Sequence, residues 1–483
     1  MKARIRTLAL ALPLCLASCS GEPTGDPAAA ISDEDRAYGA QQHPQLLAEF
    51  GGAYPGGQAG YLKAVGERVA TAAGLDGQCT FTMVNSDVVN AFAVPGCYIY
   101  VTRGLFAVVT SEAELASVLG HEVGHVVAQH SQRQERRSVW RTLGVIAVSL
   151  TGSDRLTRLA SQAAQYFGLR YSRTQEYQAD DLGVGYLEKA GYDVYAAAEM
   201  LADLQRQEAF VQATGARDAA RSIPEWALSH PLTQNRIERA RKRAEATGLQ
   251  DDALPENAAA YYARVDGLLY GDDPQQGFVI DRRFAHPVMR ITFEAPPGFS
   301  LTNSPQAVGL NGPDGVRGEF GGGPMPAGGL PRYAEALVAQ VVGDAPAQVR
   351  SSQAAEINGL PAVIVQVALQ VRQGTVPLAI AAYDGGGGEA YHFIMISPPS
   401  DAHAAALAAL FGSFRRLSPQ EAASLRPRVI RTVRARAGDT ADALSRQTVD
   451  RNPRALFALL NGDAKGALAP GAMVKIVTYA GVR

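Results

Sequence analysis

The sequence has few cysteines, almost no net charge and no long apolar run, and each of these scarcities excludes a class of protein. Its 45 basic side chains nearly balance 47 acidic ones, so the net charge of −2 gives no global reason to expect a nucleic acid partner. No apolar run reaches the roughly 20 residues of a membrane-spanning helix, and residues 143–150 are expected to be core or a peripheral membrane contact. The four cysteines include no CxxC pair, which argues against cysteine zinc ligands.

The motif His121-Glu122-Val123-Gly124-His125 carries the most chemistry. Two histidines four residues apart lie on one face of a helix, so both imidazoles can bind the same metal ion. Zinc accepts neutral imidazole nitrogen and activates water, and the carboxylate of Glu122 can act as the general base. The motif therefore predicts hydrolysis of peptide bonds.

The alternative is a chance match on an ordinary helix face. A chance HExxH is expected about once per hundred or more chains with this few histidines. The context favours function, because Ser111 and Glu114 form a capping box and apolar residues follow at helical spacing, which places the motif inside a well-capped helix. Gly124 is a poor helix former, and we expect a neighbouring backbone to approach closely there.

A catalytic zinc needs three protein ligands and an open position. Glu176 and Asp180 lie four apart on a predicted helix and so share a face. Glu176 can bind the metal, while Asp180 accepts a hydrogen bond from a ligating imidazole. The alternative is a solvated acidic helix face, but an ExxAD element about fifty residues after HExxH is the pattern of a gluzincin.

At these residues the chain resembles the HtpX-like membrane-associated zinc metallopeptidases, and among them the periplasmic BepA and LoiP type. The matching stretches lie in order between residues 80 and 245: residues 90–92 with 95–105, HEVGH, residues 172–180, and His230-Pro231 with Arg236-Ile237. One position departs from the family, because Cys97 stands where a second glycine is expected.

The resemblance implies an endopeptidase that acts on proteins of the cell envelope. It implies one Zn²⁺ per chain held by His121, His125 and Glu176, with Glu122 as the base and Asp180 behind a ligating imidazole.

Asn90, Ala91 and Phe92 begin a strand pattern that ends at a Pro-Gly turn before a second strand at residues 98–102. In proteases of this plan, the edge of a sheet binds the substrate backbone as an added strand, and these three residues are candidate substrate contacts. The alternative is an ordinary hairpin.

His230 precedes a proline, which favours extended backbone, and the resemblance places its loop near the metal. We consider two roles for it: stabilising the tetrahedral oxyanion, or occupying the open zinc position and holding the enzyme latent. The alternative is a solvent-facing histidine. Arg236, six residues on, is expected either to clamp a carboxylate or simply to pair with one.

Residues 1–19 read as a lipoprotein signal. A basic start and a short apolar core precede Leu-Ala-Ser-Cys, which resembles a lipobox, so we expect lipidation at Cys19, with a plain signal peptide as the alternative. Ser20 then suggests a lipid-anchored protein on the periplasmic side of the outer membrane, with residues 20–40 as a flexible tether. In that oxidising compartment, Cys79 and Cys97 are expected to form a disulfide that braces the sheet edge, with two free buried thiols as the alternative.

The length predicts about three domains. We expect an α+β multidomain protein with a mainly helical gluzincin protease domain and a small β-sheet (residues 41–255), a linker (256–277), an antiparallel α+β module (278–420) and a small β-α-α-β module (425–483). Residues 139–171 are expected to cover the cleft. The middle module is faintly similar to the PsbP/Mog-like fold, glycine runs at residues 321–323 and 385–388 are expected to break its strands, and His286, His392 and His403 are expected to be structural or surface residues.

The last module resembles a degenerate LysM repeat, which implies binding to the glycan of peptidoglycan. Its first strand carries an alternating row of arginines that could meet acidic wall or lipid groups or simply face solvent. Two functions remain open. The first is an active zinc endopeptidase that removes misfolded or stalled outer-membrane proteins. The second is a chaperone-like or wall-binding lipoprotein whose zinc site is latent.

Overall fold

The computed structural model describes residues 31–130, 171–214, 230–231, 234–371, 374–462 and 464–481. The predictions for the lipobox, Cys19 and the segment 139–170 lie outside these residues. None of the described helices is long and apolar enough to cross a membrane.

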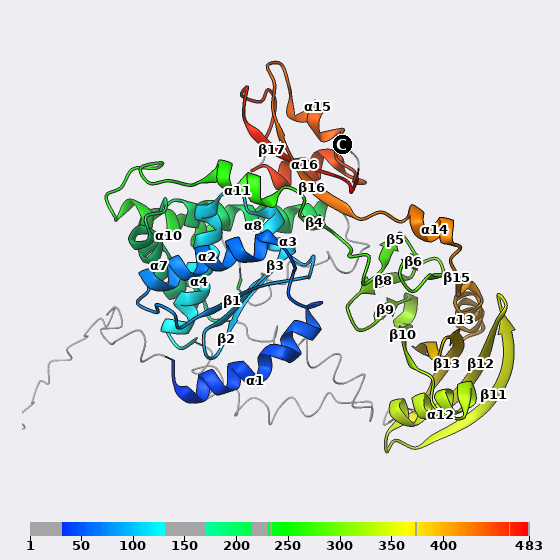
Figure 1. Ribbon diagram of the computed structural model, residues 1–483. Helices are drawn as coiled ribbons and strands as arrows, with labels where there is room; N and C mark the ends of the chain where they lie inside the picture. The colour runs from blue at the N-terminus through cyan, green and yellow to red at the C-terminus, as the bar shows by residue number, and fades with distance from the viewer. Residues whose placement is uncertain are drawn as a thin grey trace, which may run out of the picture.

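The N-terminal domain is built from helices around a three-stranded sheet (Figure 1). Its sheet contains β1 (Thr80–Val84), β2 (Ala91–Val94) and β3 (Tyr98–Thr102), in the order β1-β3-β2. Strand β3 runs parallel to β1 and antiparallel to β2, which leaves β2 at an edge. The helices are α1 (Asp33–Glu49), α2 (Gly57–Ala72), α3 (Arg103–Val108), α4 (Glu112–Val127), α7 (Arg173–Ala190), α8 (Ala196–Thr214), α10 (Gln234–Glu245) and α11 (Ala258–Val265).

Alternation along the strands divides the core between the two faces of the sheet. Tyr100 packs with Phe50 beneath α1, whereas its neighbours Ile99 and Val101 join the large cluster formed with α2 and α4. Helix α1 begins at Asp33 behind a Ser32 capping box, so the second part of the expected tether, residues 33–40, is helical. Gly39 packs so tightly that an added Cβ would lie 2.3 Å from the carbonyl oxygen of Pro95. The tether prediction was wrong for these residues.

Helices α4 and α7 cross with their backbones in close contact. A Cβ on Gly124 would lie 3.0 Å from the carbonyl oxygen of Ala179, and one on Gly120 would lie 3.4 Å from the Cα of Gly183. This is the close approach predicted for Gly124, and it sets the HExxH helix directly against the helix that carries Glu176.

The middle module contains two antiparallel sheets. A seven-stranded sheet has the order β11-β12-β13-β14-β10-β9-β8, and a four-stranded sheet has the order β15-β7-β6-β5. Helices α12 and α13 pack in separate clusters of this module. The elements are β5 (Phe278–Ile280), β6 (Arg283–His286), β7 (Ile291–Glu294), β8 (Ser300–Asn303), β9 (Val308–Asn311), η3 (Pro313–Gly315), β10 (Arg317–Pro324), α12 (Gly329–Val342), β11 (Ala347–Ile357), β12 (Leu360–Val371), β13 (Gly374–Gly386), β14 (Glu389–Ile396), α13 (Asp401–Ser413), β15 (Arg415–Arg416) and α14 (Pro419–Ser424).

The glycine run at residues 321–323 does not break a strand, because it lies inside β10 and pairs with β14. A Cβ on Gly322 would lie 2.9 Å from the carbonyl oxygen of Ala390, so close approach of the neighbouring strand explains this glycine. His392 is buried and its Nδ1 lies 2.8 Å from the Tyr333 hydroxyl, which is a structural role. The described residues around His286 and His403 form no metal-ligand group.

The C-terminal module has the β-α-α-β order: β16 (Arg428–Arg434), α15 (Ala441–Ser445), α16 (Pro453–Leu460) and β17 (Met473–Tyr479). Residues 256–277 are more than a linker, because α11 packs in the core of the N-terminal domain and β4 (Leu269–Tyr270) pairs with β16. Two arginines of the basic row are paired, Arg428 with Asp450 at 3.4 Å and Arg431 with Asp266 at 3.2 Å.

Lys475 ties the C-terminal module to the N-terminal domain. Its buried Nζ donates to the carbonyl oxygens of Ala107 at 2.7 Å, Val108 at 3.1 Å and Val109 at 2.8 Å, where α3 ends. Burial lowers the pKa of Lys475 to about 7. The module therefore docks on the segment that leads into α4.

Candidate metal centre

Ser111 is the N-cap of α4, and its hydroxyl accepts from the backbone N–H of Glu114 at 3.0 Å. The Glu114 carboxylate accepts from Thr110 instead of Ser111, so the expected capping box is only half formed. Ser172 is the N-cap of α7 and forms a capping box with Gln175. These caps fix where each helix starts and therefore which side chains face the other helix. His121, Glu122, His125 and Glu176 are all buried at the α4–α7 contact.

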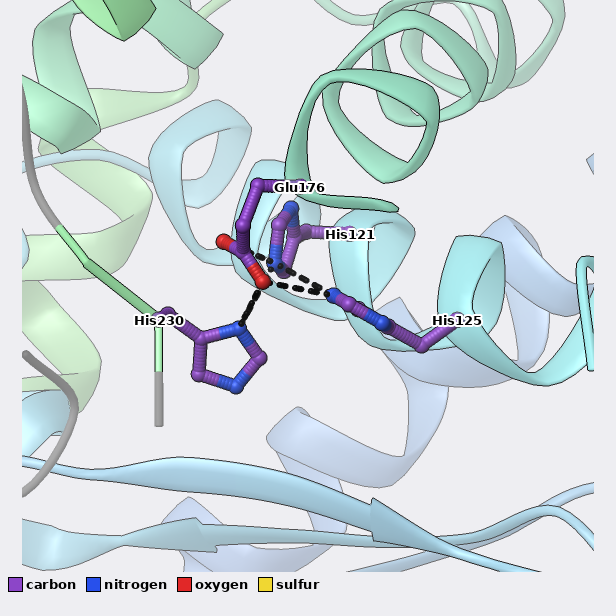
Figure 2. Close-up of side chains that lie close together, drawn as sticks. All are labelled: His121, His125, Glu176 and His230. Atoms are coloured by element: carbon purple, nitrogen blue, oxygen red, sulfur yellow. Dashed lines mark hydrogen bonds and ion pairs between the residues drawn. The ribbon is translucent and has the colours of Figure 1, made fainter. Parts of the chain in front are cut away.

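Four side chains converge on one point (Figure 2). His121, His125, Glu176 and His230 each offer a ligand atom, and these atoms all lie within 4.8 Å of one another. The Nε2 atoms of His121 and His125 are 3.0 Å apart, and the Nε2 of His125 is 3.4 Å from Oε1 of Glu176. His230 presents its Nδ1, 3.2 Å from the His121 Nε2 and 3.0 Å from the Glu176 Oε1.

This donor set fits zinc. Ligand atoms bound tetrahedrally at 2.0–2.1 Å lie about 3.3 Å from each other, and the separations above range from 3.0 to 3.4 Å. Burial lowers the pKa of His125 well below its ordinary value, which keeps the imidazole neutral, as a metal ligand must be. Burial alone would raise the pKa of Glu176, but His230, His125 and Arg236 hold it well below its usual range.

A second layer of contacts orients these ligands. The Nδ1 of His121 lies 2.9 Å from Oδ1 of Asp180, which directs the other ring nitrogen, Nε2, into the cluster. Arg236 donates to both oxygens of Asp180, at 2.9 and 2.7 Å, and its Nη1 lies 2.6 Å from Oε2 of Glu176. Although burial would raise the pKa of Asp180, Arg236 and His121 hold it at about 2.

Glu122 is turned toward the edge strand and His230. The backbone of Ala93 on β2 hydrogen-bonds to its carboxylate, and its Oε1 lies 3.7 Å from the Nε2 of His230. Burial raises the pKa of Glu122, although His230 and His121 oppose the shift. Burial would lower the pKa of His230, but the carboxylates of Glu176 and Glu122 raise it.

His130 and Tyr171 also lie beside the metal-ligand cluster, although the sequence analysis did not predict them. The Nδ1 of His130 lies 2.9 Å from the Nδ1 of His125, and its Nε2 lies 3.1 Å from the side-chain oxygen of Gln178. The Tyr171 ring lies 4.0 Å from the His125 ring. A histidine five residues after the motif, in a chain with eight histidines, was the available signal for His130. Tyr171 left no signal.

The structure places the candidate substrate residues on or beside β2. Ala91 is buried, and Phe92 stacks on Tyr100 with ring centroids 4.9 Å apart, so the Phe92 side chain packs inward. Asn90 is buried, and its backbone N–H donates to the Thr102 hydroxyl at 3.1 Å. These side chains build the hairpin, whereas the backbone edge of β2 lies next to Glu122.

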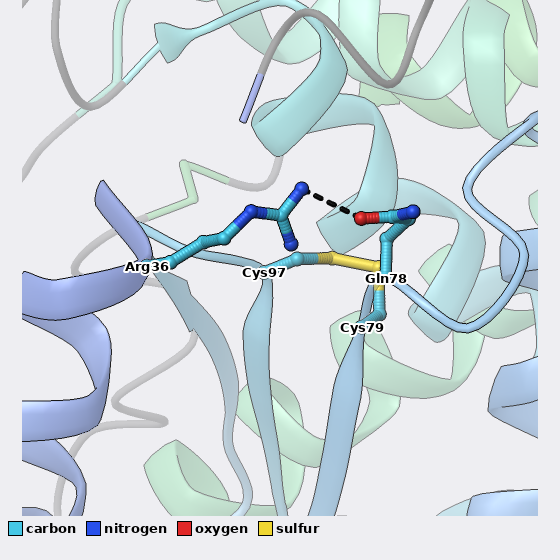
Figure 3. The surroundings of a disulfide bond; sticks show 4 residues. All are labelled: Arg36, Gln78, Cys79 and Cys97. Atoms are coloured by element: carbon cyan, nitrogen blue, oxygen red, sulfur yellow. Dashed lines mark hydrogen bonds between the residues drawn. A yellow bond between two sulfur atoms is a disulfide. The ribbon is translucent and has the colours of Figure 1, made fainter. Parts of the chain in front are cut away.

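Cys79 and Cys97 form a disulfide (Figure 3). The predicted pairing is present: the bond joins the residue before β1 to the turn that links β2 and β3, and so ties β1 to its parallel neighbour β3. The backbone of Cys97 has φ +60°, the left-handed conformation that favours glycine, which explains why a glycine was expected there. Beside the bond, Arg36 of α1 donates to the Gln78 side chain at 2.6 Å.

Comparison with known proteins assigns the fold around this cluster. The model of peptidase family M48 matches residues 57–244, a range that contains every residue of the candidate centre. Residues 57–244 are therefore similar to an M48 peptidase domain. M48 metallopeptidases use zinc, and the cluster of His121, His125, Glu176 and His230 could hold that ion.

Two relatives with names of proteases are similar to part of this chain. The beta-barrel assembly-enhancing protease of Yersinia pestis is 31% identical over 229 residues, which cover 44% of this chain and 44% of that protein. The mitochondrial metalloendopeptidase OMA1 of Arabidopsis thaliana is 37% identical over 112 residues, which cover 23% of this chain and 22% of that protein. The chain thus matches less than half the length of these relatives.

A solved structure of a PsbP protein is among those similar to this chain. The cyanobacterial PsbP of Synechocystis matches 28% of this chain and 91% of its own, at 12% identity and a TM-score of 0.22. That likeness is too slight to carry an argument, so the similarity of residues 278–420 to the PsbP/Mog-like fold stays a prediction.

Proposed function

We propose that the chain is a zinc-dependent endopeptidase of the bacterial cell envelope. The observation that carries this proposal is the convergence of His121, His125 and Glu176 at zinc-ligand spacing, with Glu122 beside them. Zinc, when bound, would polarise the scissile carbonyl and acidify water. Glu122 would take the proton from the attacking water and pass it to the leaving amine.

The edge of β2 supports a polypeptide substrate. Ala93 lies on this edge strand and its backbone contacts Glu122, so a chain that adds to β2 as a further strand would pass in front of the base. Recognition through backbone hydrogen bonds depends little on side chains. It suits an enzyme that degrades misfolded or stalled outer-membrane and periplasmic proteins, the substrate class that we propose.

We assign His230 the latch role in preference to the oxyanion role. Its Nδ1 lies among the ligand atoms of the cluster, at 3.0 Å from Glu176 and 3.2 Å from His121. A zinc ion held by all four side chains has no open position for substrate. Displacement of His230 would therefore have to precede cleavage.

The experiment compares casein cleavage by the protein without residues 1–19, its Glu122→Gln variant and its His230→Ala variant, at equal zinc content. We expect Glu122→Gln to lose at least 100-fold in rate and His230→Ala to cleave faster than the parent. A Glu122→Gln variant that retains zinc and the parent rate overturns the general-base assignment. A slower His230→Ala variant favours the oxyanion role.

The second candidate function, a chaperone-like or wall-binding lipoprotein, would hold if no variant cleaves casein.

The proposed location is the periplasmic side of the outer membrane, where the protein would be anchored through Cys19. The Cys79–Cys97 disulfide is consistent with that oxidising compartment. The LysM-like module is proposed to bind peptidoglycan. Cosedimentation of the protein with purified cell-wall sacculi tests this, and an unchanged supernatant would refute it.

A further inference from the structure

A second group of acidic side chains lies between the α7–α8 turn and the segment that follows α10. Asp193, Asp251 and Asp252 each present a carboxylate oxygen, and these atoms all lie within 4.8 Å of one another. Asp251 and Asp252 are exposed, whereas Asp193 is only 1% exposed. This group shares no residue with the M48 metal centre.

The buried carboxylate of Asp193 is only half satisfied. Its Oδ1 accepts from the backbone N–H of Tyr195 at 2.7 Å, at the start of α8. Its Oδ2 is buried and accepts no hydrogen bond from the described residues, and the backbone of Asp252 approaches the carboxylate without satisfying that atom. An ionised oxygen buried without a donor is costly, so a bound cation is the partner that the geometry lacks.

The charged side chains around the three aspartates also favour a bound cation. Within the described residues, no lysine or arginine forms an ion pair with any of the three aspartates. Glu199 and Glu256 hydrogen-bond to each other nearby, and burial, followed by repulsion from Glu256, Glu114 and Asp251, raises the pKa of Glu199 to about 8. Glu199 therefore keeps its proton at pH 7, because the acidic groups around it oppose a further negative charge.

Three carboxylates with neither histidine nor cysteine form a site for a hard cation. Mg²⁺ requires a near-ideal octahedron of oxygens at about 2.0–2.1 Å, whereas Ca²⁺ takes six to eight oxygens at about 2.3–2.6 Å in flexible geometry. Ca²⁺ also accepts the irregular geometry of ligands from two loops.

We propose that Asp193, Asp251 and Asp252 form a calcium site that fixes the segment between α10 and α11 to the M48 domain. This segment already touches the domain at two places. The N–H of Asp193 donates to the carbonyl of Pro255 at 3.4 Å, and the N–H of Ala113 on α4 donates to the carbonyl of Glu256 at 3.1 Å. Calcium would stabilise the connection between the M48 domain and the C-terminal module.

The test titrates CaCl₂ into the full-length protein by calorimetry and follows the melting temperature. The Glu122→Gln background prevents self-cleavage, and zinc is kept constant in every arm. We expect one Ca²⁺ per chain and a melting temperature that rises with calcium, because a ligand of the folded state stabilises it by mass action. Asp193→Asn and Asp251→Asn should each weaken binding at least 10-fold.

Asparagine at position 193 can still accept from Tyr195 through its side-chain oxygen, so this variant keeps the start of α8. Asp251→Asn changes an exposed side chain and serves if Asp193→Asn fails to fold. Asp344→Asn, an exposed aspartate of the middle module, is the matched control and should bind like the parent. No heat or melting shift with calcium, unchanged binding in both site variants, or Mg²⁺ binding as tight as Ca²⁺ would each overturn the proposal.

Discussion

Asp180 is the position at which the structure makes its most quantitative prediction. Its carboxylate accepts from two nitrogens of Arg236 and lies 2.9 Å from the Nδ1 of His121, and all three side chains are buried. The Asp180→Asn substitution keeps the shape but removes the charge. It also places an amide donor where one of these nitrogens needs an acceptor, which adds to the loss.

The size of the effect follows from the pKa of Asp180, which falls from 3.8 to about 2 in the folded protein. A shift of this size corresponds to roughly 2.5 kcal/mol of folding free energy. Because the pKa of Asp180 is lower in the folded than in the unfolded chain, its ionised carboxylate stabilises the fold fully above pH 3.8, and this stabilisation is lost as the pH falls toward 2. At pH 7 the metal-free Asp180→Asn variant should therefore be about 2–3 kcal/mol less stable than the parent.

The assay is urea unfolding of both metal-free proteins at pH 7, followed by zinc titration against a competing chelator. Zinc affinity should fall about 10- to 100-fold, because a residue that orients a ligating imidazole is lost. The control is Asp181→Asn, since the neighbouring Asp181 pairs with Arg239 at the surface, where an ion pair contributes about 1 kcal/mol or less. If Asp180→Asn costs no more than Asp181→Asn in stability and in zinc affinity, the orienting role is refuted.

Three further outcomes are expected. Gly124→Ala should lower the free energy of unfolding in urea by about 1–3 kcal/mol, because the added Cβ would lie 3.0 Å from the α7 backbone. Gly185→Ala is the control: its Cβ would lie 4.0 Å from the nearest atom, on the Arg243 side chain, so this change should be neutral or stabilising. Between pH 7 and 10.5 the lysine keeps its proton in the unfolded chain but releases it in the folded one, so the parent gains stability as the pH rises. The unfolding free energy of the parent minus that of Lys475→Met should therefore grow by up to about 1.4 kcal/mol per pH unit. A difference that does not change with pH would contradict the depressed pKa of Lys475. Replacing both Cys79 and Cys97 by serine should lower the free energy of unfolding by about 3 kcal/mol, given the 18-residue separation. Reducing the disulfide of the parent should give the same urea midpoint as the double variant, because both lack the same bond.

The sequence predicted the metal centre better than the arrangement of the modules. Helix geometry explains why His121 and His125 share a face, whereas Glu176, on another helix, was expected from the ExxAD pattern and the family resemblance. His130 and Tyr171 belong to the same site, but their contacts depend on how α7 lies against α4. Sequence periodicity does not encode that contact.

The errors outside the site share a cause. Residues 321–323 were expected to break a strand and residues 33–40 to form a tether, because glycine-rich and polar stretches favour turns and linkers locally. In the folded chain, close approach of a neighbouring strand favours glycine in β10, and burial of Gly39 against Pro95 holds α1 in place. Likewise, nothing local to residues 256–277 indicated that β4 pairs with a strand about 160 residues later.

Zinc content tests the central claim most directly, because every assigned role depends on one shared ion. The account predicts one zinc per chain, measured by elemental analysis, in the parent and in Glu122→Gln, and at least 10-fold weaker zinc binding in His125→Ala and Glu176→Gln. Full zinc occupancy with unchanged affinity in these last two variants would show that the ion, if present, is bound elsewhere.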